Sequence, residues 1–368
     1  MNNLNIRKKI FKKKQKYVKL KSVTTKKEKC IYDIGLAILR PILAFFVIMT
    51  HCYDYNGATG KWREIIIKAN RLRYHVPTFF IISFYFSYKT LTSLNYKKIF
   101  ERFQRLCIPY FLWPIIVFLL NKLLIKYSIT KKEITLNHLK NQLLYVTGDM
   151  GLNILWFQWD LIFITILFII IIFIFRKNYN FVFILINITS FIYLYNGKNF
   201  FYFSKYTYLK KIVFGRILEM IPYTVIGFLI SSSEIINIFK KHRLIIIITC
   251  TYLIYFLLNY QIFKDLKGNG YPGFKKFFIS ICIFIIFAMF PSEKIKNKRL
   301  ITIIKQITGY TAGIYYTHCL ITEYICNYII LIKKRTLKGC IIIYLICYLI
   351  SFVGILIFGK TKLRHLFI

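Results

Sequence analysis

Two ionisable residues, Arg40 and His51, interrupt an otherwise apolar stretch near the start of the chain, LRPILAFFVIMTHC (residues 39–52). An ionisable side chain at the centre of a membrane costs about 3 kcal/mol on insertion scales, so such residues usually serve a function. Arg40 and His51 are eleven residues apart. At about 100° per residue this is three full helical turns plus about 20° of rotation, so both side chains lie on one helix face, about 16 Å apart along the axis.

This spacing suggests that the two side chains have different chemical roles at two positions along one helix face. An arginine can bind an anionic group, and an imidazole can remove a proton near neutral pH. The two side chains are too far apart to touch, but they can bracket one elongated substrate. His51 can also simply mark the end of the helix at the membrane surface, beside Asp54.

The elements that must position this pair are membrane helices. Of the 368 residues, 57% are hydrophobic and 19% aromatic, and the mean hydropathy is +0.54. A soluble domain of this size carries fewer apolar blocks, so we expect an all-α, polytopic membrane helix bundle. Windows of about twenty residues predict about ten transmembrane helices. They fall near 31–53, 76–93, 107–127, 153–175, 179–196, 212–231, 244–261, 274–291, 306–331 and 340–359.

The ends of the chain are expected to lie outside this bundle. Residues 1–30 are strongly basic, and no convincing cleavage site follows them, so we interpret the first span as an uncleaved signal anchor. The expected organisation is a cytoplasmic tail at 1–30, an integral-membrane domain at 31–360 and a cytoplasmic tail at 361–368. The basic residues near span ends predict a multi-pass protein of the plasma membrane with both termini in the cytoplasm.

The charge and the cysteines exclude two classes of protein. Lysine and arginine number 54 against 13 acidic residues. These bases fall mainly in short gaps between apolar runs, where they anchor helix ends to lipid headgroups, so we expect no nucleic-acid partner. Nine cysteines are scattered without a CxxC pair, and no cluster has the spacing of metal ligands, so we expect no metal.

Four further motifs follow the Arg40–His51 pair. They are VPTFFIIS at 76–83, RFQRLCIPYFLW at 102–113, LWF at 155–157 and GIYYTH at 313–318. In this order and spacing the chain resembles acyltransferase family 3, the ten-span integral-membrane O-acyltransferases that modify cell-surface polysaccharides. The first span of that family carries an arginine, ten residues and then a histidine, which Arg40 and His51 match. The resemblance covers about residues 31–360.

The chain departs from the family pattern at two positions. Phe84 follows Ser83 where the family often has glycine, which leaves in doubt the close helix approach that a glycine allows there. Ala37 stands three residues before Arg40, where the family commonly has an acidic residue, and Asp33 lies one turn further back.

The resemblance implies an O-acetyltransferase that moves an acetyl group from acetyl-CoA, or another acyl group from its CoA ester, to a hydroxyl of a cell-surface or lipid-linked carbohydrate. The CoA ester is then a substrate, and no bound cofactor is expected. We expect His51 to act as the base and Arg40 to contact the donor. Arg102 and Arg105 are expected to hold the phosphates of CoA.

Four more residues match family motifs and are expected to contact the donor or acceptor: Ser83, Trp156, Tyr315 and His318. Trp156 can equally be an aromatic anchor at the membrane interface, and His318 can equally be a packed core histidine. A covalent acyl-histidine intermediate fits the sequence as well as direct transfer does.

A transporter or flippase of an anionic or lipid-linked solute is the alternative function. Its charges would line a pathway instead of performing covalent chemistry. That function would favour inverted repeats with paired broken helices, and the sequence shows no such pairing. The sequence identifies neither the sugar, nor the acyl group, nor the oligomeric state.

Overall fold

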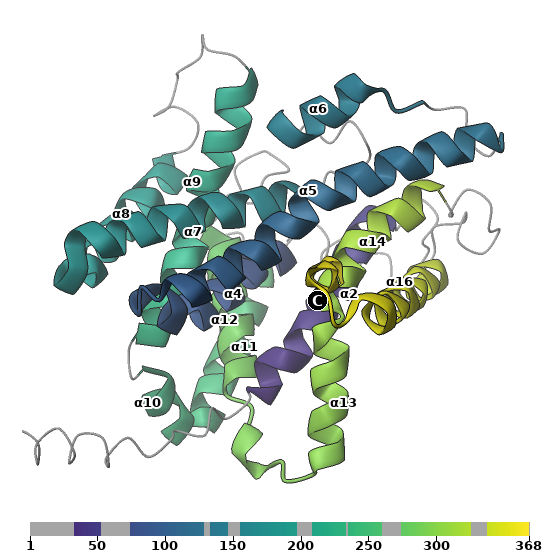
Figure 1. Ribbon diagram of the computed structural model, residues 1–368. Coiled ribbons are helices and arrows are strands. Elements are labelled where there is room, and N and C mark those ends of the chain that lie inside the picture. The colour runs from purple at the N-terminus through teal and green to yellow at the C-terminus, as the bar shows by residue number, and fades with distance from the viewer. Residues whose placement is uncertain are drawn as a thin grey trace, which may run out of the picture.

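The computed structural model describes residues 33–52, 74–128, 133–145, 155–196, 208–232, 235–259, 274–324 and 337–367. These residues form helices and their connections, without a strand. The helices are α2 (Ile34–Cys52), α4 (His75–Thr92), α5 (Tyr96–Lys126), α6 (Leu136–Tyr145), α7 (Leu155–Phe175), α8 (Tyr179–Asn196), α9 (Tyr208–Ser232), α10 (Ile235–Lys241), α11 (Arg243–Asn259), α12 (Phe274–Ala288), α13 (Lys298–Gly309), α14 (Thr311–Tyr324) and α16 (Leu337–Phe358), with the short 3-10 helices η2 (Arg176–Asn178), η4 (Ser292–Lys294) and η5 (Lys362–Leu366). In Figure 1, α6 lies at the top of the bundle, and α10 and α13 lie at the bottom.

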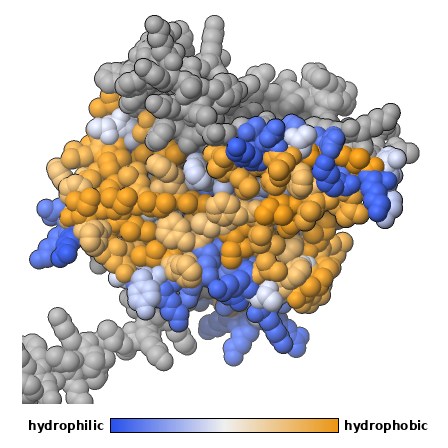
Figure 2. All heavy atoms as spheres, turned by 45° about the horizontal axis from the view of Figure 1, so that its top comes forward, coloured by the Kyte–Doolittle hydropathy of each residue, from blue (hydrophilic) through white to orange (hydrophobic). Residues whose placement is uncertain are grey.

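The bundle has the surface of a membrane protein. Figure 2 shows a broad hydrophobic band across one face, with hydrophilic residues above and below it. In the described part of the chain, five helical stretches are long and apolar enough to cross a membrane, or six if the bent pair α9–α10 counts as one span. The prediction of an all-α membrane bundle is therefore confirmed, but its count of ten spans is not. Helices α4, α11 and α14 coincide with predicted spans but are shorter or more polar than that criterion requires.

Helix α4 packs on several neighbours, and its closest approach is to α9. A Cβ atom built on Gly227 of α9 would lie 2.3 Å from the carbonyl oxygen of Ile81, so only glycine fits at this crossing. Phe84 is fully buried, and its ring lies 4.6 Å from that of Phe168. The close approach that Phe84 left in doubt is thus supplied by a glycine on the partner helix.

Helix α2 begins at a side-chain cap and contains a proline. The Asp33 carboxylate accepts a hydrogen bond from the Leu36 N–H (3.1 Å), so this acidic residue caps the helix. Pro41 has no N–H, so the Ala37 carbonyl lacks the donor that it would otherwise have four residues later. The Thr308 hydroxyl of α13 lies 2.9 Å from that carbonyl oxygen, close enough to supply the missing hydrogen bond. This contact fixes α13 against α2, one turn from Arg40.

The C-terminal segment is part of the bundle. Helix η5 packs against α5, and the Phe367 ring stacks on Phe358 with centroids 6.1 Å apart. A Cβ atom on Gly354 would lie 2.6 Å from the Phe367 ring, so the glycine leaves room for it. Burial lowers the pKa of His365, and the charges of Arg364 and Arg105 lower it further. Residues 361–367, expected to form a tail, therefore cover part of α5.

The contact between Thr308 and Ala37 gives a test of the fold. Replacing Thr308 with Val should lower the free energy of unfolding by about 1 kcal/mol, because the carbonyl freed by Pro41 loses its donor. The loss should shrink in a Pro41→Ala background, where the helix supplies its own N–H. Thermal unfolding of the four proteins in detergent measures this coupling. Equal losses in both backgrounds would show that the Thr308 hydroxyl, which also lies 2.7 Å from the Ile304 carbonyl of its own helix, serves only α13.

Candidate active site

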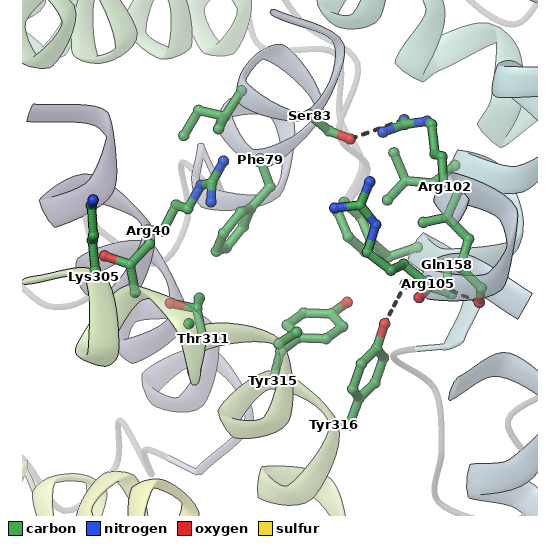
Figure 3. A pocket seen from close by; sticks show the side chains of 17 residues that line it. Arg40, Phe79, Ser83, Arg102, Arg105, Gln158, Lys305, Thr311, Tyr315 and Tyr316 are labelled. Atoms are coloured by element: carbon green, nitrogen blue, oxygen red, sulfur yellow. Dashed lines mark hydrogen bonds between the residues drawn. The ribbon is translucent and has the colours of Figure 1, made fainter. Parts of the chain in front are cut away.

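A cavity of about 420 Å³ lies among helices α2, α4, α5, α7, α13 and α14. Four of the described residues that line this cavity are cationic, and none of its described lining residues is acidic. Arg40 comes from α2, Arg102 and Arg105 from α5, and Lys305 from α13. Figure 3 shows Arg40 and Lys305 on one side of the cavity and the other two cations on the opposite side. The cavity therefore favours an anionic ligand.

Arg102 is held by neutral partners. Its guanidinium donates to the Ser83 hydroxyl (3.3 Å) and to the Thr165 hydroxyl (3.3 and 3.4 Å). It also lies over the Phe84 ring, 5.5 Å from the centroid. None of these contacts is a carboxylate, so its positive charge is oriented but not neutralised. The predicted site residues Ser83 and Arg102 thus lie together in the cavity.

Arg105 lies one turn before a proline inside α5. Pro109 has no N–H, so the Arg105 carbonyl lacks its usual intrahelical donor. The buried Gln158 amide of α7 donates to the Leu106 carbonyl (2.9 Å) and approaches the Arg105 carbonyl (3.5 Å). Its own oxygen accepts from the Tyr316 hydroxyl of α14 (2.5 Å). One glutamine therefore connects three helices around the cavity.

Gln158 and Lys305 were not predicted as site residues. Gln158 directly follows the LWF motif. Pro109 lies four residues after Arg105, so the sequence already indicates that the Arg105 carbonyl needs a hydrogen-bond donor from another helix. Lys305 carried no such signal, because one more lysine in a basic gap between apolar runs looks like a lipid anchor.

Four aromatic residues from three helices line the cavity beside the cations: Phe79 of α4, Phe157 of α7, and Tyr315 and Tyr316 of α14. The Tyr315 ring of α14 lies 5.4 Å from Phe157 of α7 and 6.4 Å from Phe79 of α4. The structure places Tyr315 in the lining, as expected for a site residue. Trp156 is not among the lining residues, and its ring instead packs edge-on against Phe157, at 6.3 Å.

The histidines His51 and His318 lie next to each other, beyond this aromatic wall. Their ring centroids are 5.4 Å apart, and neither residue lines the cavity. His318 is fully buried, whereas His51 is exposed at the end of α2. Tyr315 connects the two regions, because its ring lines the cavity and lies 5.8 Å from the His318 ring. Along α2, Arg40 thus lines the cavity, whereas His51 lies beside His318, outside the lining.

A hydrogen bond sets the protonation of His318. Its Nδ1 lies 2.6 Å from the Tyr315 carbonyl oxygen. Because a carbonyl oxygen can only accept, Nδ1 carries the proton, and Nε2 is the basic nitrogen of the neutral ring. Within the described ranges, no group of three histidine, cysteine or acidic residues could hold a metal ion.

Comparison with known proteins gives one match. A family model described as an acyltransferase domain matches residues 33–360, a range that includes the whole cavity and both histidines. Neither the curated proteins nor the solved structures contain a significant match.

The different exposure of the two histidines predicts different chemical reactivity. Diethyl pyrocarbonate should modify His51 about as fast as His242, which is exposed between α10 and α11. It should modify His318 much more slowly, because that ring is fully buried. Peptide mass spectrometry over a time course in detergent measures the three rates. Modification of His318 at the rate of His242 would contradict the described packing of α14 against α2.

Proposed function

The chain belongs to acyltransferase family 3, and from this membership we propose that it transfers an acetyl group from acetyl-CoA to a hydroxyl of a cell-surface or lipid-linked carbohydrate. The observation that carries the proposal is the cationic cavity, joined by the Tyr315 ring to a pair of histidines. An anion site beside a proton acceptor is what acyl transfer from a CoA thioester requires.

The donor is proposed to occupy the cavity. Its CoA part carries several negative charges, and hydrogen bonds between guanidinium and phosphate are among the strong ones in proteins. A cavity of about 420 Å³ falls within the usual range of ligand pockets. Arg40, Arg102 and Arg105 would hold the phosphates, with Arg102 already oriented by Ser83. The acyl end would then extend along α2 and α14 toward the histidines.

The acceptor is proposed to approach His51, the exposed member of the pair. A sugar hydroxyl is a weak nucleophile, and a positioned imidazole can remove its proton near neutral pH. As the hydroxyl oxygen bonds to the thioester carbonyl carbon, its proton passes to His51. The tetrahedral intermediate then breaks its carbon–sulfur bond, and the CoA thiolate leaves and takes up a proton. His318 lies close enough to orient His51 or share the proton.

The two substrates would come from opposite sides of the plasma membrane. Acyl-CoA is cytoplasmic, so the Arg40 end of α2 is proposed to face the cytoplasm, together with both termini. The His51 end would face the carbohydrate on the other side. The spacing of the two residues along α2, about 16 Å, lets one extended donor reach both.

Replacing His51 tests the proposed base. His51→Ala should lower acyl transfer about 10²–10⁴-fold and leave CoA binding near wild type, because a base acts on the reaction barrier. Arg40→Ala should weaken donor binding as well. Mass spectrometry of acetylated glycans and calorimetric titration with CoA measure the two effects.

A positional swap provides the control for this test. Thr50→His combined with His51→Thr keeps composition and depth but rotates the imidazole by about 100°. Wild-type transfer by this variant would sink the proposal that His51 acts from the α14 side of the helix.

Replacing the two arginines of α5 tests the donor site. Arg102→Gln with Arg105→Gln should weaken CoA binding at low salt, and the difference from wild type should shrink at high salt, because the lost attraction is screened. The matched control is Lys97→Gln with Lys98→Gln, which removes equal charge from exposed positions of the same helix. Equal affinities of the two double variants at low salt would argue against a donor site at Arg102 and Arg105.

A further inference from the structure

The four cations of the cavity form two pairs with the same construction. On one wall, Arg102 is half-buried and Arg105 is exposed, and both belong to α5. On the other wall, Arg40 is half-buried and Lys305 is exposed, and they belong to α2 and α13, which pack together. Each wall thus offers one half-buried cation and one exposed cation, and Figure 3 shows the two pairs on opposite sides of the cavity.

Contacts with α4 keep the two walls apart. The Arg102 guanidinium lies over the Phe84 ring at 5.5 Å, and the Arg40 guanidinium lies over the Phe86 ring at 4.8 Å. Two residues along a helix correspond to about 200° around its axis. The two arginines are therefore held against different sides of α4, and Arg102 is held further by hydrogen bonds to Ser83 and Thr165. They are not arranged to close on one small anion.

The wall formed by Arg40 and Lys305 contains a further polar group. Thr311 begins α14, lines the cavity and is only 6% exposed. Its hydroxyl oxygen makes no hydrogen bond with the described residues. A buried hydroxyl without a partner is unfavourable, and a small rotation beside a bound anion would give it one.

We propose that the cavity contains two separate phosphate subsites, Arg102–Arg105 and Arg40–Lys305, and therefore selects ligands with phosphate groups at two positions. The inference rests on the proposed function and assigns the phosphates of the donor to two separate sets of residues. An acyl-CoA carries a diphosphate and a separate ribose phosphate, and can fill both subsites. An acyl group on the phosphopantetheine of a carrier protein has a single phosphodiester and fills only one.

Three adenosine ligands test the two subsites. Calorimetric titration of the full chain in nanodiscs would use adenosine 3′,5′-bisphosphate, adenosine 3′-phosphate and adenosine 5′-phosphate. The wild-type protein should bind the bisphosphate about tenfold or more tightly than either monophosphate, since each charge-assisted contact contributes about that factor. If the wild-type protein does not bind the bisphosphate, the result would instead overturn the proposal that acyl-CoA is the donor.

Matched lysine variants then separate the walls. Lys305→Met should weaken binding of the bisphosphate about tenfold and should weaken binding of only one of the two monophosphates. Lys298→Met removes the same charge from an exposed position two turns earlier in α13, outside the lining, and should bind all three ligands like wild type. Lys305→Arg should keep the wild-type affinities, which would show that a loss in Lys305→Met reflects charge and not misfolding.

The α5 variant completes the test. Arg102→Gln with Arg105→Gln should weaken binding of the bisphosphate and of the other monophosphate, whose affinity Lys305→Met leaves unchanged. Two results would overturn the proposal: Lys305→Met behaves like Lys298→Met, or the Lys305 and α5 variants weaken both monophosphates to the same extent. The second result would mean that all four cations surround one anion.

Discussion

The constraint around which the site is built is its positive charge, because four of the described lining residues are cationic and no described lining residue is acidic. A cation inside an apolar bundle is costly unless it is paired or hydrated. The protein reduces this cost with the faces of aromatic rings under Arg40 and Arg102, with the hydroxyls of Ser83 and Thr165, and with exposure of Arg105 and Lys305. These contacts orient the charges, and because the described lining residues include no carboxylate, the cavity favours an anion.

The helices around this charge are fixed by two backbone carbonyls that prolines release. Pro41 frees the Ala37 carbonyl, which the Thr308 hydroxyl of α13 approaches, and Pro109 frees the Arg105 carbonyl, which the Gln158 amide of α7 approaches. In each case a polar side chain from another helix lies near a carbonyl that has lost its intrahelical donor, next to a cation of the cavity. Since unsatisfied carbonyls are costly in an apolar interior, these two contacts favour the observed positions of α13 and α7.

The sequence predicted the parts of the site that combine an unusual residue with a regular spacing. Arg40 and His51 stand out because ionisable residues are rare in apolar helices. Arg40 lines the cavity, whereas His51 lies beside His318 of α14, outside the lining. Ser83, Arg102, Arg105 and Tyr315 matched motifs and line the cavity. The position of Trp156 outside the lining was not predictable, because LWF offers two adjacent aromatic residues and only packing decides that Phe157 lines the cavity. Hydropathy located most of the helices but did not predict how many of them cross the membrane. A hydropathy window measures the length of an apolar stretch and detects neither helix tilt nor a helix break, such as the one between α13 and α14 at Tyr310.

The cationic cavity is proposed to hold an acyl-CoA whose reactive end reaches the histidine pair. A cryo-electron microscopy map of the full chain with a non-hydrolysable acetyl-CoA analogue would test this arrangement. We expect phosphate density within hydrogen-bonding distance of Arg102, Arg105, Arg40 and Lys305, and the acyl group past the Tyr315 ring, beside His51 and His318. Phosphate density away from these four cations, or an acyl group on the far side of the cavity from the histidines, would contradict it.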